Sequence, residues 1–210
     1  MKEEPRDSAE TQELLRQARS GEPEALEQLF ARYQTYLRRI IEMRLDTVIR
    51  RRLDASDVLQ ETQMEATRRL ADYLEREAVP FRLWLRQIAH DRLLKARRMH
   101  VGTHQRSIAR EIPLPDNSSL QLVRQLVAKG STPSQHIAKK ELAGRVRRAL
   151  SKLPDTDREI LLMRTFEKLS YGQIGYILGI EEAAANMRHV RALMRLSKIL
   201  HENGLTGSKI

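Results

Sequence analysis

The 210-residue sequence contains no cysteine, only 4% aromatic residues and no long apolar run. The lack of cysteine excludes disulfides and thiolate zinc sites. No apolar stretch approaches the ~20 residues of a membrane-spanning helix, and the acidic start MKEEPRDSAE lacks the apolar segment of a signal peptide. These absences predict a helix-rich cytoplasmic protein that does not insert into a membrane.

Signatures of catalysis are also missing. The sequence has no glycine-rich phosphate loop, no cysteine nucleophile and no His-Glu-x-x-His motif. His100 and His104 are four residues apart and could share a helix face, but no carboxylate or third histidine is near them in sequence. We therefore expect no enzymatic activity, no catalytic residue, no cofactor and no metal site.

The chain is strongly basic, with a formal net charge of +10. A basic protein favours a polyanionic partner, most commonly nucleic acid, although a plainly solvated basic surface stays possible. The charge is arranged in blocks. Residues 54–80 hold seven acidic and three basic side chains, whereas residues 81–110 hold one acidic and eight basic ones. These blocks predict elements that face different partners.

Hydrophobic spacing predicts three helices in the first half. One runs from Glu24, with Pro23 at its start, and the second begins at Asp54 or Ser56 and ends near Glu77. The third starts at Pro80-Phe81. Its basic end beyond Asp91 shows no apolar stripe, so we expect that end to project from the core.

The second half begins with a stretch rich in proline, serine and glycine, residues 103–133, which predicts a linker with one short helix at 120–129. A helical unit follows from Ser134 to Leu153, and Asp155 and Ser170 are expected to cap the next two helices. The fold class predicted is all-α, with two small helical domains, an N-terminal helical bundle and a C-terminal helix-turn-helix domain, joined by a flexible linker.

Gly175 and Gly179 predict the helix-turn-helix. Gly179 suits a corner that requires positive φ, and Gly175 suits the place where the first helix crosses the second. The second helix of such a motif can lie in the major groove of DNA, while a three-helix bundle without DNA is the alternative. Gly172 and Gly175 lower helix propensity, so we expect a loosely packed module that binds DNA weakly by itself.

Two segments together carry a family resemblance. DVLQET (57–62) and FRLWLRQIAHD (81–91) come first, and LPDTDREILLMRTFEKLSYGQIGYILGIEE (153–182) follows. In this order the chain resembles the extracytoplasmic-function (ECF) group of bacterial RNA polymerase sigma factors from Glu24 to Leu200. The resemblance implies partners: core RNA polymerase, promoter DNA both duplex and melted, and, as an open alternative, an anti-sigma factor. It implies these domains: 1–102 sigma region 2, 103–133 linker, 134–203 sigma region 4, and 204–210 tail.

The resemblance implies a polymerase-binding surface on the acidic second helix, against a coiled coil of the largest polymerase subunit. Charge complementarity would fix its register. A solvated acidic helix face is the alternative. The residues implied are Asp57, Leu59, Gln60, Glu61 and Met64.

The third helix and the loop before it correspond to the part that melts the minus-ten element and captures an unpaired base. The implied contacts are Tyr73, Arg82, Arg86, Asp91, Arg92 and Lys95. Trp84 could stack on a base, but it shares a face with Phe81 and Ile88, so we predict core packing. Asp91 stands where the family often has Asn, and a carboxylate would read a donor edge such as cytosine N4.

The resemblance implies minus-thirty-five contacts from Asn186, Met187, Arg188, Val190, Arg191 and Arg195. Asn186 could pair with adenine and Arg191 with guanine, whereas Arg188 and Arg195 suit phosphates. Ala184 and Ala185 replace the family's usual Thr and Val. His189 stands where an apolar residue packs the helix down.

Two rival interpretations stay open. A stand-alone helix-turn-helix regulator would bind duplex DNA tightly as a dimer without polymerase. A helical scaffold that binds RNA through its arginines would show no sequence preference.

Overall fold

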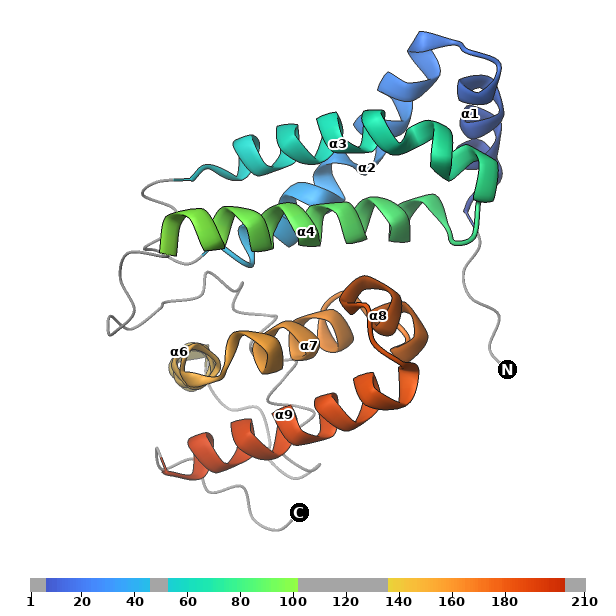
Figure 1. Cartoon of the computed structure of the whole chain (residues 1–210). Helices are drawn as coiled ribbons and strands as arrows, with labels where there is room; N and C mark the ends of the chain where they lie inside the picture. Colours follow the sequence, from blue (N-terminus) through green and yellow to red (C-terminus); the bar gives the residue numbers. More distant parts are fainter. Residues whose placement is uncertain (1–6, 46–52, 102–135, 203–210) are drawn as a thin grey trace. The chain divides into compact units, whose positions relative to one another are not determined.

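The computed structural model describes residues 7–45, 53–101 and 136–202. These residues form two compact units, and within them every regular element is a helix (Figure 1). The predicted all-α fold class with two helical domains is confirmed. The predicted linker 103–133 with its short helix, His104 and the tail 204–210 lie outside the described residues, so the exact domain bounds stay predictions.

The first unit contains four helices: α1 (Ala9–Arg19), α2 (Pro23–Glu42), α3 (Ala55–Arg76) and α4 (Phe81–Val101). In Figure 1, α3 and α4 lie side by side with α2 behind them. Helix α1 was not predicted from the sequence. Ser8 caps it by accepting a hydrogen bond from the Thr11 N–H at 3.3 Å, and only Leu14 and Leu15 supply buried apolar side chains.

Local signals place both ends of α3 as predicted. Asp54 is the N-cap: its carboxylate accepts the Ser56 N–H at 3.3 Å, while the Asp57 carboxylate accepts the Asp54 N–H at 3.2 Å. At the other end Glu77 adopts a left-handed φ of 37°. The Tyr73 hydroxyl then donates to the Val79 carbonyl at 3.1 Å and fixes the loop that leads into α4.

Aromatic side chains form one end of this unit's core. The Trp84 ring stacks on Tyr73 with centroids 4.5 Å apart, and Phe81 packs against both and against Tyr33. Trp84 is buried, which confirms the prediction of core packing.

The expected projection of the basic end of α4 is wrong. Leu93 and Ala96 are buried among the arginines and continue the apolar stripe. The Arg97 guanidinium also donates to the Arg44 carbonyl at 2.6 Å, which ties this part of α4 to the end of α2.

The second unit contains α6 (His136–Lys152), α7 (Asp155–Thr165), α8 (Tyr171–Leu178) and α9 (Glu182–Glu202). Pro154 rather than Asp155 is the N-cap of α7, so the predicted cap is one residue late; Asp155 instead pairs with Arg158. Ser170 caps α8 as predicted, in a reciprocal capping box with Gln173.

The second unit is not loosely packed, contrary to expectation. Ile160–Met163 are essentially inaccessible to solvent, as are Leu150 and Leu196. Helix α9 packs on α6, α7 and α8. The low helix propensity of Gly172 and Gly175 is therefore offset by burial of apolar side chains from all four helices.

Candidate functional site

The turn between α8 and α9 has the predicted geometry. Gly179 adopts φ 64°, in the left-handed region that favours glycine. A Cβ on Gly175 would lie 2.5 Å from the Ile180 carbonyl oxygen, so only glycine permits this close approach. The Ile180 N–H donates to the Gly175 carbonyl at 3.0 Å and closes the turn. Together α8 and α9 form a tightly joined helix-turn-helix.

Helix α9 has one buried stripe and one exposed face. The stripe consists of Ala185, His189, Ala192, Leu196 and Leu200. All six residues predicted to contact the minus-thirty-five element lie outside this stripe. Five are exposed and one, Arg188, is half-buried. They therefore share the solvent-facing part of the helix, as a groove-reading role requires. Met194, 67% exposed on the same face, was not predicted.

His189 packs inward, at the position where the family resemblance implies an apolar residue. Its Nδ1 lies 3.1 Å from the Tyr171 hydroxyl on α8, while its Nε2 is buried without a hydrogen-bond partner among the described residues. Burial, and to a lesser extent the positive charge of Arg164, lowers the pKa of His189. The imidazole is therefore held in its neutral form where it packs between α8 and α9.

Arg195 forms an ion pair with Asp157 of α7. The Asp157 side chain is buried, whereas that of Arg195 is 57% exposed. Beside this pair is a hollow of about 400 Å³, lined by Asp157, Ala184, Met187, Arg188, Arg191 and Arg195. The hollow thus combines three arginines with one buried carboxylate and is suited to an anion such as a phosphate.

On α3, Asp57, Gln60, Glu61 and Met64 are all exposed and recur at three- and four-residue steps, so they lie on one helix face. Leu59 does not belong to this face. It is 3% exposed and packs in the core on the same side of the helix as Thr62 and Ala66. We therefore remove Leu59 from the candidate polymerase-binding surface.

Two of the predicted minus-ten residues are also corrected. Tyr73 belongs to the aromatic core, and Arg86 is fully buried on the face of α4 that contains Ala89 and Leu93. Arg86 is not accessible to DNA in this structure, and Tyr73 reaches the surface only where it lines the hollow beside the α3–α4 loop. Arg82, Asp91 and Arg92 are half-buried and Lys95 is exposed. The Arg82 guanidinium lies over the Tyr36 ring, 5.2 Å from its centroid, and Arg92 lies 3.8 Å from Glu65.

The loop between α3 and α4 borders a second hollow, of about 430 Å³. Its walls are the loop residues Glu77–Pro80, Tyr73 of α3 and side chains of α1, including Gln12, Arg16 and Arg19. Arg19 donates to the Leu74 carbonyl at 2.7 Å and to the Glu77 carboxylate at 2.6 Å, and so holds the loop against α1. The contribution of α1 could not be predicted, because no helix was expected there.

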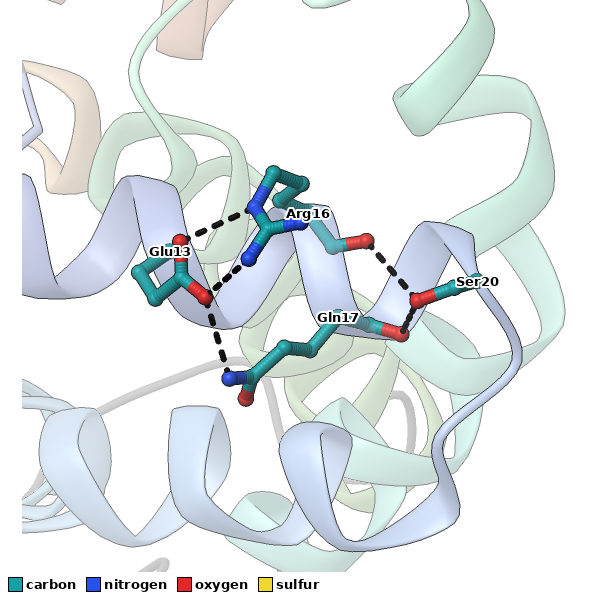
Figure 2. Close-up of polar contacts among 4 residues, drawn as sticks. All are labelled: Glu13, Arg16, Gln17 and Ser20. Atoms are coloured by element: carbon teal, nitrogen blue, oxygen red, sulfur yellow. Dashed lines mark hydrogen bonds and ion pairs between the residues drawn. The ribbon is translucent and has the colours of Figure 1, made fainter.

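Figure 2 shows the polar contacts that fix Arg16 on α1. Its Nε donates to the Glu13 carboxylate at 2.9 Å, and the Gln17 amide donates to the same carboxylate at 3.1 Å. Pairing with Arg16 lowers the pKa of Glu13. The Ser20 hydroxyl donates to the Arg16 and Gln17 carbonyls and finishes the helix. The wall that α1 contributes to the hollow is thus polar.

Asp7 also lines this hollow. Its carboxylate accepts the Phe81 N–H at 2.7 Å and so caps α4. Burial raises the pKa of Asp7, although the hydrogen bond from Phe81 opposes the shift.

Comparison with known proteins agrees with this geometry. A family model described as Sigma-70, region 4 matches residues 143–196. The RNA polymerase sigma factor YlaC of Bacillus subtilis (strain 168) is 28% identical over 144 residues, covering 69% of this chain and 76% of YlaC. The ECF RNA polymerase sigma factor SigM of the same organism is 29% identical over 174 residues, covering 82% of this chain and 94% of SigM. The chain belongs to the ECF group of bacterial sigma factors.

The fold of this sigma factor is also shared with a solved structure. The structure of CnrH in complex with the cytosolic domain of CnrY superposes with a TM-score of 0.59 at 23% identity, covering 93% of this chain and 99% of CnrH. The SigM alignment of 174 residues is longer than either helical unit. The likeness to sigma factors therefore extends over both units and is not confined to the helix-turn-helix. Among the described residues, no helix combines the length and hydropathy that a membrane span requires.

Proposed function

We propose that this sigma factor binds core RNA polymerase and directs it to specific promoters through separate surfaces for polymerase and DNA. The observation that carries this is the α8–α9 helix-turn-helix, whose Gly175 permits the close crossing, within the stretch that matches sigma region 4. Sigma region 2 is assigned to residues 1–102, the linker to 103–133 and sigma region 4 to 134–203. The role involves no catalysis by this chain and is exercised in the cytoplasm. Membership of the group also allows an anti-sigma factor as a regulatory partner.

The polymerase-binding surface is assigned to the exposed face of α3. Asp57, Gln60, Glu61 and Met64 combine negative charge with one apolar side chain, which suits a partner lined with arginine. Asp57 also accepts a hydrogen bond from the N-cap of its own helix, so its replacement would weaken α3 as well as docking. Glu61 and Met64 have no such capping role and are the better positions at which to test docking.

Contacts to the melted minus-ten element are assigned to the outer part of α4 and to the hollow beside the loop. Lys95 and Arg92, with Asp91 one turn before Lys95 on the same side of the helix, can face a single-stranded backbone. The hollow of about 430 Å³ is of a size that takes a small organic group such as an unpaired base. Holding that base would offset the few kcal/mol that unpairing costs.

The minus-thirty-five element is assigned to the exposed face of α9. Asn186 and Arg191 have the hydrogen-bonding groups that read adenine and guanine edges, each worth about 1–3 kcal/mol of discrimination. Arg188 is assigned to a phosphate. Arg195 is assigned to a phosphate as well, and its contact with DNA would compete with its ion pair to Asp157.

Reconstituted transcription tests the function. Core polymerase is combined with the full-length protein and a genomic promoter library, and transcript starts are mapped. Specific starts that depend on this protein are expected, together with weak duplex binding by the protein alone. Absence of starts with protein shown to be folded would overturn the assignment. Tight duplex binding without polymerase would favour a stand-alone regulator.

A further inference from the structure

The outermost part of α9 is apolar. Met187, Val190 and Met194 are 52%, 37% and 67% exposed, and all three are large hydrophobic side chains. At 100° per residue they fall within an arc of about 60° opposite the buried stripe. We call these three residues the α9 ridge. Since an exposed apolar patch commonly marks a binding surface, the ridge is a candidate binding surface.

The arginines of α9 lie to one side of the ridge. Arg188, Arg191 and Arg195 border the hollow next to Asp157, on the flank of α9 that turns toward α7. When a helix enters a groove, its outermost residues reach deepest and its flanks face the groove walls. Negative phosphates would then meet Arg188 and Arg195, while base edges would meet the α9 ridge and Arg191 beside it. This arrangement of charge favours DNA over a protein helix as the occupant.

The edges of bases in the major groove are mostly hydrogen-bonding groups, and the 5-methyl group of thymine is the apolar exception. An apolar ridge set against donors and acceptors would leave those polar groups without partners, which is costly. Set against methyl groups, the same ridge removes apolar surface from water. We propose that the α9 ridge reads thymine methyl groups in the minus-thirty-five element, an inference that rests on the proposed function.

Replacement of thymine by deoxyuracil tests this directly, because it removes the methyl group and leaves the base pairing unchanged. The template is the strongest promoter found by the start mapping described above, and the protein is the full chain bound to core polymerase. Each thymine of the minus-thirty-five element is replaced singly, and holoenzyme binding and transcript starts are measured. At one or more positions we expect about a fourfold loss, the size of burying one methyl-sized group.

Variants of the ridge then identify the reader. Met187→Ala and Met194→Ala should each weaken binding to the thymine template by a similar factor and add nothing on the template that lacks the corresponding methyl. Gln28→Ala, which truncates an exposed side chain of similar length on α2 outside every assigned surface, is the matched control and should behave as wild type on both templates. Surface methionines can be truncated without loss of folding, which circular dichroism checks.

The outcomes separate the inference from the function. If starts depend on the protein but every deoxyuracil substitution is neutral, the thymine proposal fails and the sigma assignment stands. The proposal also fails if the methionine variants lose the same factor on both templates. If the ridge variants lose binding to core polymerase in the absence of DNA, the ridge is a protein-docking surface instead. If no specific starts occur, the proposed function itself fails.

Discussion

Substitution of Gly175 by alanine probes the crossing on which the helix-turn-helix depends. The added Cβ would lie 2.5 Å from the Ile180 carbonyl oxygen, 3.5 Å from the Glu182 nitrogen and 3.6 Å from the Glu181 carbonyl carbon. All three are backbone atoms, so no flexible side chain can move aside. The turn must shift, and the hydrogen bond from the Ile180 N–H to the Gly175 carbonyl must lengthen.

The change in stability of Gly175→Ala is the sum of two unfavourable contributions and one favourable one. Overpacking costs about 1–3 kcal/mol and loss of the hydrogen bond about 1 kcal/mol, whereas alanine gains about 1 kcal/mol of helix propensity over glycine. The net expectation for Gly175→Ala is a loss of about 1–3 kcal/mol in the second unit. Gly144→Ala in α6 is the matched control. Its added Cβ would meet no atom within 4 Å, so this variant should gain up to about 1 kcal/mol.

Native-state hydrogen exchange is the suitable assay because it reports the stability of each helix separately. Amides of α8 and α9 should exchange faster in Gly175→Ala, and those of α6 more slowly in Gly144→Ala. Fluorescence of Trp84, which lies in the first unit, should stay unchanged in both. A Gly175→Ala protein as stable as wild type would refute the claim that this crossing requires glycine.

Three further predictions follow from the other surfaces. Glu61→Lys should abolish co-purification with core polymerase, because it reverses a charge on the polymerase-binding face of α3. Glu27→Lys, at an exposed position of α2, should leave co-purification unchanged. Equal binding by both variants would contradict the assignment of this face. His189 has a lowered pKa in the folded state, so its contribution to stability is complete above the unfolded pKa of about 6.5 and is lost as pH falls. The variant His189→Leu should therefore show a smaller drop in the Tm of the second unit between about pH 7 and pH 5 than the wild type. The same drop in both proteins would contradict this. Arg195→Ala should destabilise the second unit by about 1–3 kcal/mol, because it leaves the buried Asp157 carboxylate unpaired. Asp157→Asn should cost less, since the exposed Arg195 guanidinium returns to water. Urea denaturation that gives the reverse order would contradict this difference between the two partners.

Elements with strong local signals were predictable from the sequence. The caps at Asp54 and Ser170, the proline at the start of α2 and the glycine corner at Gly179 each fix a backbone conformation through residues next to one another, and each was found where expected. Helix α1 was not predicted, because a short segment with balanced charges and only two buried leucines resembles a solvated tail.

Burial was harder to predict than helix position. Arg86 was grouped with the surface arginines of α4, although it lies three and seven residues before the buried Ala89 and Leu93. Leu59 similarly precedes the buried Thr62 and Ala66 by three and seven residues. In both cases the spacing to buried neighbours was the available signal. For Arg86 the charge of the side chain outweighed this spacing, and for Leu59 the match to the family motif outweighed it.

Site-specific crosslinking in the promoter complex tests most directly the division between a polymerase-binding face and a DNA-binding face. A photoreactive amino acid is placed at Met64 on α3 and, in a second protein, at Met187 on α9, both of which are exposed. Position 64 should crosslink to a polymerase subunit and position 187 to DNA in the minus-thirty-five region. Crosslinks from position 64 to DNA, or from position 187 to polymerase alone, would contradict the assignment.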